Sequence, residues 1–359
     1  MKTLINIPSL DMIGGVSQIY RILKLNDSPE IDYFIIMNEK EVTKFKKIKR
    51  LILKYFQYFF TIQKYDMVIL NPSFVKNAFF RDSIYCVIAQ LFHKNIIVFW
   101  HGWEDSFENN LKSSWWKKKL FLMTFSQVDT TLVLGTIFKN KLQSLGAKDT
   151  KYVSMTSIAD DTDLKNFNIE GKFNNQSKKE KIDFLFLSRI EKEKGIYIAI
   201  DTINEINKRN NDICTLHVAG TGSELDKVKE YVSVKQIKNI VFHGYVSGKD
   251  KFQLLESTDI FFFPTYFGEG LPNSILEAML YAQPIISRIN AGVPDQVIKN
   301  KNGFLSESIN YKDFLPFIEY FIKNRSEIRR MGLVNHKKAK ESFTAEKVKE
   351  KYLSIIGSI

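Results

Sequence analysis

The sequence has only two cysteines, Cys86 and Cys214, which lie far apart inside apolar runs. Thiols so few and so distant exclude a disulfide scaffold and a zinc knuckle, and we interpret them as buried side chains. Glycine and proline are also sparse, at 17 and 8 of 359 residues. With 44% hydrophobic and 26% charged residues, this composition excludes a collagen-like, low-complexity or disordered chain. At about 150 residues per domain, the length predicts two domains.

Long hydrophobic runs are absent as well. The longest stretches without a charged residue, 83–93 and 213–223, have 11 residues, whereas a membrane-spanning helix needs about 20 apolar residues. At the N-terminus, eight uncharged residues separate Lys2 from Asp11, which is too short a run for a signal peptide. We therefore expect a cytoplasmic protein that does not cross a membrane.

Negative charge is scarce in the first half of the chain. The formal net charge is +12, and residues 40–148 contain 18 lysines and arginines against seven aspartates and glutamates. Such a surface attracts polyanions, either nucleic acid or anionic lipid, although solubility alone is an alternative explanation. Two stretches, 44–56 and 114–122, mix lysine with aromatic and aliphatic residues. They are typical of helices that lie on a membrane surface, unless the same helices bury their apolar faces in the protein.

Short apolar runs alternate with longer periodic segments along the chain, as in doubly wound α/β domains. The predicted strands of the first half are 3–7, 33–37, 67–70, 96–100, 131–134 and 151–155. Those of the second half are 182–187, 213–219, 240–242, 260–263 and 284–287. After them we expect about three helices and no further strand.

The polar segment 170–181 has one apolar side chain in twelve residues and predicts an interdomain linker. It separates an N-terminal domain, 1–169, from a C-terminal domain, 182–344, and a last helix, 345–359, crosses back to the first domain. The predicted fold is α/β, with two Rossmann-like doubly wound domains facing across a cleft. Ligands of parallel sheets bind beyond the carboxyl ends of the strands, so functional residues should lie in the loops that follow strands.

Two such loops in the first half carry candidate residues. Gly14 and Gly15 come between the first strand and a helix start, where free backbone amides favour an anion; a plain tight turn is equally consistent. Their spacing is not that of a nicotinamide dinucleotide site. His101 ends a strand beside Gly102 and is therefore placed to meet a ligand.

The second half offers two more loops. Arg189 and Lys194 follow the strand 182–187 and precede a helix. A planar two-pronged donor beside a compact point charge suits a diphosphate, although a charged loop is often only solvated. Gly220 and Gly222 follow the next strand. Glycines at this place let a planar ligand group approach closely, or they are needed because the helix and strand pack tightly there.

The strongest motif contains two carboxylates, Glu269 and Glu277, in the segment 267–279. If this segment were wholly helical, the two would lie about 12 Å apart. The carboxyl groups of glycosidases lie about 5–9.5 Å apart across one bond. The pair therefore fits the hydrolysis of a glycosidic bond poorly, and we expect each carboxylate to accept hydrogen bonds from hydroxyls at a different end of one ligand.

With these motifs the chain resembles the retaining nucleotide-sugar glycosyltransferases of the GT-B architecture, family four, in which a Glu–seven residues–Glu element is the signature. The resemblance covers the whole chain and is more specific in the second half. It implies that Glu277 binds the ribose, that Glu269 binds the transferred sugar, and that His101 lies near that sugar. Arg189 and Lys194 match the diphosphate-binding pair. The segments 291–297 and 302–305 resemble the start of the family's last helix.

The candidate catalytic residues are His101, Arg189, Lys194 and Glu269. The residues expected to bind the nucleotide sugar are Gly15, Gly220, Gly222, Gly270, Leu271, Pro272, Asn273 and Glu277.

The chain also departs from the family pattern. Gln18 stands where the family usually has glutamate, and the segment 157–161 lacks the usual Asn-Gly before an aspartate; both put details of the acceptor side in doubt. Asp161 and Asp163 spell the Asp-x-Asp of metal-dependent transferases, but they fall outside the expected nucleotide site. We expect no metal and no cofactor, because Arg189, Lys194 and helix amides would neutralise the leaving diphosphate.

The resemblance implies a retaining transfer of a hexose or N-acetylhexosamine, with UDP favoured over GDP, to a sugar hydroxyl. The acceptor would be a lipid-linked oligosaccharide of surface-polysaccharide synthesis, met at the inner face of the cell membrane. Three alternatives remain: a sugar-nucleotide epimerase of similar fold, a catalytically silent relative, and a basic nucleic-acid-binding protein. The last has no recognisable module here, so we expect no nucleic-acid partner.

Overall fold

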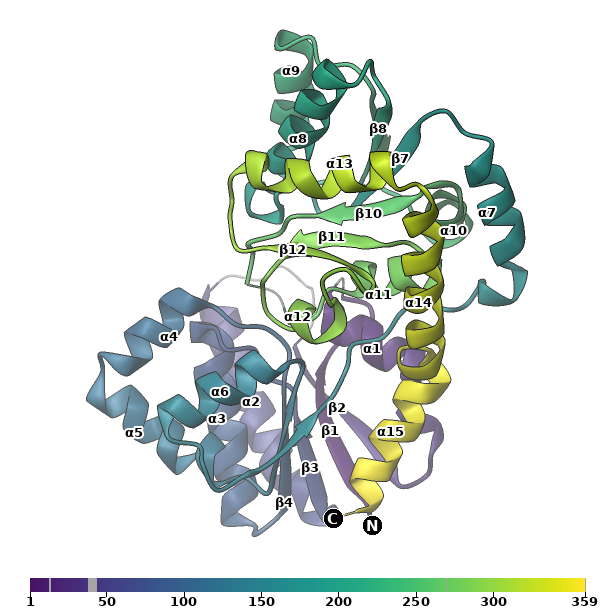
Figure 1. The fold of residues 1–359 in the computed structure, drawn as a ribbon. Helices are drawn as coiled ribbons and strands as arrows, with labels where there is room; N and C mark the ends of the chain where they lie inside the picture. Colours follow the sequence, from purple (N-terminus) through teal and green to yellow (C-terminus); the bar gives the residue numbers. More distant parts are fainter. Residues whose placement is uncertain (13, 38–43, 269, 359) are drawn as a thin grey trace. The chain divides into compact units, whose positions relative to one another are not determined.

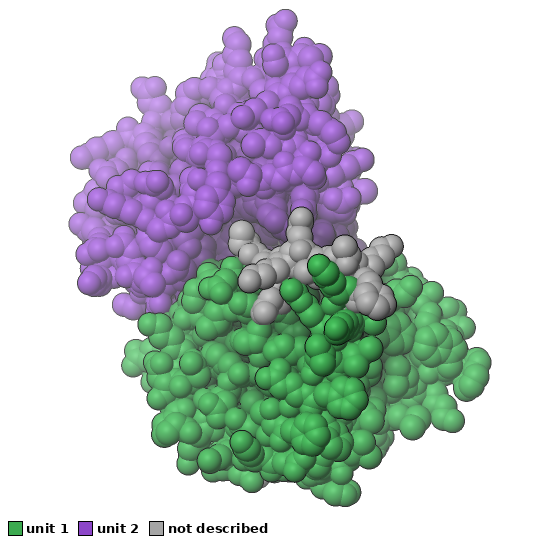
Figure 2. Space-filling model, turned by 180° about the vertical axis from the view of Figure 1, so that it is seen from behind, with its two compact units in different colours: residues 1–157, 268–271, 345–359 green, residues 158–267, 272–344 purple. Residues whose placement is uncertain are grey.

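The computed structural model describes residues 1–12, 14–37, 44–268 and 270–358. They form two compact units, coloured separately in Figure 2. Unit 1 comprises 1–157, 268–271 and 345–359, and unit 2 comprises 158–267 and 272–344. Each unit has its own six-stranded parallel sheet with helices around it (Figure 1). The prediction of two doubly wound α/β units is confirmed.

The sheet of unit 1 has the strand order β2-β1-β3-β4-β5-β6. Its third strand is buried at all four positions, as expected for a parallel strand whose two faces are covered by helices. The order reverses between β1 and β3, which makes the carboxyl ends of these strands the switch point where ligands of such sheets bind. The strands are β1 Thr3–Pro8, β2 Ile31–Met37, β3 Met67–Leu70, β4 Asn95–Trp100, β5 Thr130–Val133 and β6 Lys151–Ser154.

The helices of unit 1 include the last helix of the chain. Helix α15 packs against α1, and α2 packs against α3. The α-helices are α1 Gly15–Leu23, α2 Lys44–Thr61, α3 Lys76–Leu91, α4 Asp105–Lys112, α5 Trp115–Met123, α6 Thr136–Leu145 and α15 Ala345–Gly357. Short 3-10 turns are η1 Leu25–Asp27, η2 Ile62–Lys64 and η3 Phe125–Gln127.

The sheet of unit 2 has the order β12-β11-β10-β7-β8-β9, which is the order of dinucleotide-binding sheets, with the switch point between β7 and β10. The four residues of β10 are all buried. The strands are β7 Ile182–Leu187, β8 Cys214–Ala219, β9 Ile240–Gly244, β10 Ile260–Phe263, β11 Ile285–Arg288 and β12 Gly303–Ser306.

The helices of unit 2 cover this sheet. Helix α13 packs against α8, and α11, which is buried from Ile275 to Leu280, packs against α14 (Figure 1). The helices are α7 Ile169–Ser177, α8 Ile196–Arg209, α9 Leu225–Val234, α10 Gly248–Ser257, α11 Asn273–Leu280, α12 Val293–Gln296, α13 Leu315–Lys323 and α14 Ser326–Ser342. The 3-10 turns are η4 Leu164–Asn166, η5 Lys192–Lys194 and η6 Tyr311–Phe314.

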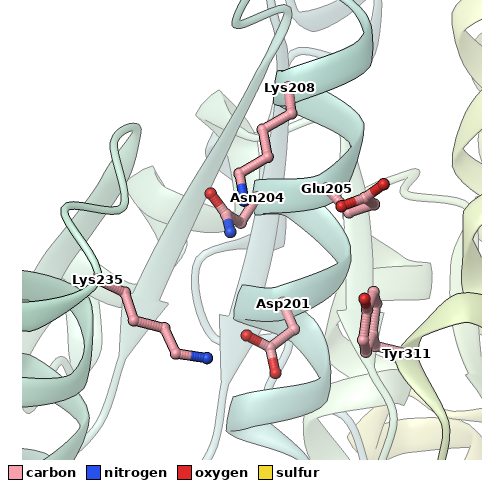
Figure 3. Close-up of a pocket in the computed structure, with 6 residues that line it drawn as sticks. All are labelled: Asp201, Asn204, Glu205, Lys208, Lys235 and Tyr311. Carbon is pink, nitrogen blue, oxygen red and sulfur yellow. The ribbon is translucent and has the colours of Figure 1, made fainter.

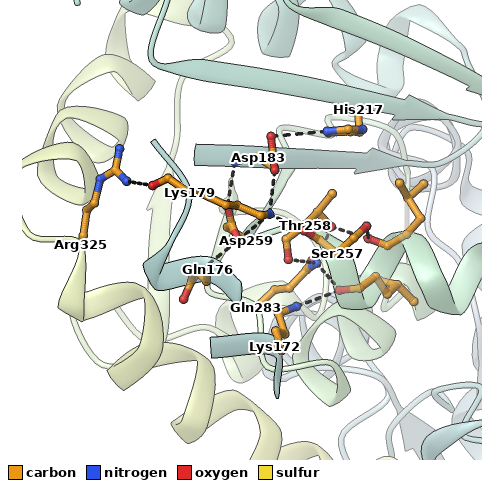
Figure 4. A network of polar contacts seen from close by, with 12 residues as sticks. Lys172, Gln176, Lys179, Asp183, His217, Ser257, Thr258, Asp259, Gln283 and Arg325 are labelled. Carbon is orange, nitrogen blue, oxygen red and sulfur yellow. Dashed lines mark hydrogen bonds and ion pairs between the residues drawn. The ribbon is translucent and has the colours of Figure 1, made fainter. Parts of the chain in front are cut away.

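The segment 170–181 is not the linker that its polarity predicted. Most of it forms α7, and unit 2 already begins at Ile158. Lys172 is buried and its ammonium donates to the carbonyl oxygens of Leu255 and Tyr281, both at 2.8 Å. Lys179 donates to Asp183 at 2.7 Å (Figure 4). The segment is polar because its inward-facing lysines meet carbonyl and carboxylate oxygens, which a pattern of apolar residues does not record.

A second difference concerns the end of unit 2. Residues 303–306 form the edge strand β12, where we expected a helix start and no further strand. Because β12 has only four residues and lies at the edge of the sheet, its apolar run is too short to predict a strand. None of the helices in the described parts of the chain is long and apolar enough to span a membrane.

Candidate functional site

The switch point of unit 2 brings together two loops that are far apart in the sequence. One loop follows β7 and contains Arg189 and Lys194, and the other follows β10. The backbone amide of Tyr266 donates to the carbonyl oxygen of Glu193 at 2.8 Å. A Cβ at Gly195, where φ is 84°, would lie 2.3 Å from the carbonyl oxygen of Pro264. The two loops are therefore in close backbone contact, and glycine is required at 195.

Two cationic side chains meet one aromatic ring at this switch point. The ammonium nitrogen of Lys194 lies 4.0 Å from the centroid of the Phe267 ring, and the guanidinium carbon of Arg189 lies 5.5 Å from it. Lys194 is 5% exposed, whereas the side chain of Arg189 is 60% exposed and its Nη1 donates to Glu191 at 2.8 Å. Both cations therefore lie within cation–π distance of one ring, and positive charge gathered in this way suits a diphosphate.

Gly220 and Gly222 pack tightly against the same loop. A Cβ at Gly220 would lie 1.8 Å from the carbonyl oxygen of Ser188, and one at Gly222 would lie 2.4 Å from that of Ile190. The Ile190 amide also donates to the Thr221 carbonyl at 2.9 Å. This packing by itself explains both glycines, so their contact with a nucleotide stays a prediction.

Glu277 lies inside α11 and is 4% exposed. Its Oε1 accepts a hydrogen bond from Lys251 at 3.0 Å, and the same ammonium donates to Asp160 at 2.9 Å. Burial raises the pKa of Glu277, and the charge of Lys251 opposes this rise. For Asp160, burial is outweighed by Lys251, and the pKa of this carboxyl is lowered. Sequence reasoning missed Lys251, which lies on a helix with no motif around it.

The loop between β10 and α11 is divided between the units. Glu269 lies outside the described residues, so its predicted role stays a prediction. Gly270 belongs to unit 1, where its Cβ would lie 2.0 Å from the carbonyl oxygen of His101. Leu271 is buried in unit 1. In unit 2, Pro272 precedes α11 and Asn273, which is half-buried, is its first residue.

In unit 1, the strand ends carry a hydrogen-bonded cluster around His101. The Nε2 of His101 lies 2.8 Å from Oδ1 of Asn71, the residue that follows β3. Asn71 also bonds Tyr20 and the backbone of Asn6. Burial lowers the pKa of His101 to about 3, so this imidazole is neutral at physiological pH. Sequence reasoning missed Asn71, although its place directly after a buried strand was a usable signal.

Gly15 starts helix α1 and is exposed. A Cβ at Gly14 or Gly15 would meet no described atom within 4 Å. Packing in the described residues therefore does not require glycine here, in contrast to Gly195. Open space at the positive end of a helix is compatible with an anion, and the predicted phosphate contact of Gly15 stays a prediction.

A separate polar pocket of about 320 Å³ lies beside α8 (Figure 3). None of the predicted site residues lines it. Its lining consists of Asp201, Asn204, Glu205, Lys208, Lys235 and Tyr311.

Within the residues that the structure describes, there is no group of three or more His, Cys, Asp or Glu side chains that could hold a metal ion. In the segment that spells Asp-x-Asp, Asp163 accepts a hydrogen bond from the side chain of Asn166 at 2.5 Å.

Comparison with known proteins finds similarity to glycosyltransferases. Residues 168–338 match the family model described as glycosyl transferases group 1. The chain is 25% identical over 321 residues to "Uncharacterized glycosyltransferase MJ1069" of Methanocaldococcus jannaschii, which covers 84% of this chain and 78% of that protein. It is 22% identical over 219 residues to the amylovoran biosynthesis glycosyltransferase AmsK of Erwinia amylovora, which covers 59% of this chain and 51% of AmsK.

Solved structures show the same fold over the whole chain. The crystal structures of Anabaena Alr3699/HepE in complex with UDP and with UDP-glucose superpose with TM-scores of 0.76 and 0.73. Sequence identity is 15% and 14%, and both chains are covered completely. Residues 168–338 are therefore similar to the glycosyl transferases group 1 family, and the fold of the chain is that of the GT-B glycosyltransferases.

Proposed function

We propose that this protein is a retaining, metal-independent glycosyltransferase that uses a UDP-linked hexose or N-acetylhexosamine. The observation that carries the proposal is the pair of cations, Arg189 and Lys194, on the ring of Phe267 at the switch point of a group 1 domain. In doubly wound sheets this is the place where nucleotides bind. Binding of UDP and UDP-glucose by the similarly folded Alr3699/HepE supports the choice of UDP.

In the proposed reaction, the bond between the anomeric carbon and the diphosphate breaks first. Arg189 and Lys194 stabilise the negative charge that develops on the leaving diphosphate. Because these cations supply the positive charge, the proposal needs no divalent metal. The acceptor hydroxyl attacks from the face that the diphosphate leaves, and a phosphate oxygen takes its proton, so the configuration at the anomeric carbon is retained.

The two carboxylates of the motif bind different parts of the donor in this proposal. Glu277 accepts hydrogen bonds from the ribose hydroxyls, and the charge of Lys251 favours its ionised form inside α11. Glu269 binds the transferred sugar, and His101 accepts a hydrogen bond from one of its hydroxyls. The family match favours transfer over nucleic-acid binding as the function of the chain.

The acceptor is proposed to be a lipid-linked sugar at an anionic membrane surface. The predicted interfacial helices expose many apolar side chains instead of burying them, which argues against the alternative explanation. Helix α3 contacts both of these helices. It packs against α2, where Phe59 also contacts Phe92 just beyond the end of α3, and its Phe80 stacks on Trp116 of α5. Among the side chains that the structure describes on these helices, the large exposed apolar ones are Ile48, Ile52, Leu53, Phe56, Phe59, Phe60, Ile84, Val87, Leu91, Trp115, Trp116 and Met123.

Lysines and arginines are exposed on two of these helices, and we call the exposed residues of α2, α3 and α5 together the α2–α5 surface. Lys46, Lys49, Arg50, Lys118 and Lys119 are exposed on the same two helices. Exposed apolar side chains that gather on one surface often mark a binding site. Mixed with positive charge, the α2–α5 surface is complementary to an anionic bilayer. The similarity to a glycosyltransferase of amylovoran biosynthesis supports the proposal that the transferred sugar becomes part of a polysaccharide.

The test is an activity screen with UDP- and GDP-sugars, each with and without a polyprenyl-linked sugar acceptor, in buffer containing excess EDTA. The proposal predicts acceptor-dependent release of UDP, retention of the α configuration, and full activity in EDTA. Interconversion of the donor sugars without an acceptor would instead show an epimerase. Loss of transfer in EDTA, restored by Mg²⁺ or Mn²⁺, would contradict the metal-independent reaction.

A further inference from the structure

Asn71 makes three side-chain hydrogen bonds at the switch point of unit 1. It is 5% exposed and follows β3, which lies between β1 and β4 in the sheet. Its Nδ2 donates to the backbone carbonyl oxygen of Asn6 at 3.0 Å. Its Oδ1 lies 2.8 Å from the hydroxyl of Tyr20 and 2.8 Å from Nε2 of His101. One buried amide therefore connects the ends of three neighbouring strands.

These partners fix the orientation of the amide. The carbonyl oxygen of Asn6 can only accept, so the group facing it must be the NH₂ of Asn71, and Oδ1 must face Tyr20 and His101. A flipped amide would place two oxygens against each other at 3.0 Å. An amide oxygen is only an acceptor, so both the Tyr20 hydroxyl and Nε2 of His101 must donate to it.

The tautomer of His101 follows from this arrangement. With a proton on Nε2 and a neutral ring, Nδ1 carries a lone pair and is a hydrogen-bond acceptor. Burial supports the neutral ring, since it lowers the pKa of His101 to about 3. The ring also contacts Phe99, with 4.0 Å between the ring centroids.

Besides His101, the titratable groups in this cluster are tyrosine hydroxyls that keep their protons. Burial raises the pKa of Tyr20 and of Tyr352, whose hydroxyls are hydrogen-bonded to each other. Because Tyr20 donates to Asn71, Tyr352 must donate to Tyr20. Tyr352 comes from the last helix, α15, which thereby completes a chain of donors that ends at Oδ1 of Asn71.

We propose that Asn71 is a positioning residue that holds His101 as the neutral Nε2–H tautomer, so that Nδ1 presents a lone pair to a hydroxyl group of the donor sugar. The role in transfer rests on the proposed function, whereas the tautomer rests on the geometry of unit 1 alone. A lone pair at this position accepts from a hydroxyl and repels a carboxylate.

The test is long-range ¹H–¹⁵N correlation spectroscopy of protein labelled with ¹⁵N-histidine, with the His101 signals assigned from a His101→Gln variant. The proposal predicts one protonated Nε2 and one unprotonated Nδ1 from pH 5 to pH 8. In Asn71→Leu, the tautomers should mix and kcat should fall about tenfold or more, while the affinity for UDP, which has no donor sugar, should not change. Tyr33→Phe is the matched control, since its hydroxyl bonds the backbone of Leu25 and Tyr20 and not Asn71.

Each result decides one point. An Nδ1–H tautomer or a doubly protonated ring at pH 6 in the unaltered protein overturns the proposal, even if Asn71→Leu does not fold. An unchanged spectrum and kcat in folded Asn71→Leu also overturns it. If the unaltered protein transfers no sugar from any donor, the proposed function fails, and the spectrum still reports the tautomer.

Discussion

The ammonium nitrogen of Lys251 lies 3.0 Å from Oε1 of Glu277, inside unit 2, and 2.9 Å from Oδ2 of Asp160. The side chains of Lys251 and Glu277 are only 12% and 5% exposed. One lysine thus neutralises the motif carboxylate proposed to bind the ribose, and it ties that carboxylate to the segment that begins unit 2.

Replacing this lysine should affect both stability and nucleotide binding. In Lys251→Met, Glu277 is left buried without its cation, and breaking such a pair destabilises a protein by about 3–5 kcal/mol. The pKa of Glu277 should rise further, so the carboxylate should be protonated at neutral pH and UDP should bind more weakly. Denaturant unfolding and calorimetry with UDP measure the two effects.

The double variant Lys251→Met/Glu277→Gln is the control for that prediction. Removing both charges should recover most of the lost stability but not the affinity for UDP. If Lys251→Met has the same free energy of unfolding and the same affinity for UDP as the unaltered protein, the pair does not have the role that we assign to it.

The two motif carboxylates should differ when each is changed to glutamine. Glu277→Gln should weaken the binding of free UDP, because it replaces a ribose-binding carboxylate with a neutral amide. Glu269→Gln, at a position outside the described residues, should leave UDP affinity nearly unchanged and reduce transfer. Calorimetry and turnover separate the two, and the reverse pattern would mean that the donor binds in the opposite direction.

Except for the edge strand β12, the sequence predicted both sheets, and it predicted the main site loops, for a simple physical reason. Buried parallel strands are continuous apolar runs, so 67–70, 182–187 and 260–263 were located to the residue. The loops after strands were then fixed by topology, which placed Arg189 and Lys194 near the switch point. Lys251 and Asn71 could not be assigned to a carboxylate or a histidine, because their partners are 26 and 30 positions away and are neighbours only in the fold.

The buried Lys172 predicts a pH dependence of stability. Burial lowers its pKa to about 7 from an ordinary value of 10.5. Between these values the unfolded chain holds a proton that the folded protein does not, so this group's contribution to the free energy of unfolding rises with pH from 7 to 10.5 and is constant below 7. Relative to Lys172→Met, the unaltered protein should gain up to about 4 kcal/mol across this range.

Chemical denaturation at several pH values between 7 and 9.5 gives this comparison. Lys178→Met, at an exposed position on the same segment, should show no such trend relative to the unaltered protein. A difference between the unaltered protein and Lys172→Met that is independent of pH would mean that Lys172 is charged in the folded state.

The α2–α5 surface should bind anionic membranes. Flotation with phosphatidylglycerol vesicles should recover the protein at low ionic strength, and recovery should fall as the Debye length decreases from about 30 Å to 10 Å. Changing Lys117, Lys118 and Lys119 to glutamate should weaken the binding, since each basic residue near the surface contributes about 1 kcal/mol. UDP affinity should stay the same.

The matched control places the same charge change on unit 2, at the exposed residues Lys299, Lys301 and Lys312. This variant should float like the unaltered protein. Equal recovery with neutral and anionic vesicles, or no recovery with either, would contradict a membrane-bound acceptor and favour a soluble one.

The central claim is that the cations on Phe267 bind the diphosphate of a nucleotide sugar, and calorimetric titration with UDP tests it most directly. The unaltered protein should bind one UDP, and Arg189→Ala should lose at least tenfold in affinity and about a hundredfold in kcat/KM, on the scale of one preorganised donor. Arg209→Ala is the control, because Arg209 is also exposed and paired with a glutamate but lies at the far end of α8. No binding of UDP by the unaltered protein, or equal binding by Arg189→Ala and Arg209→Ala, would contradict the account.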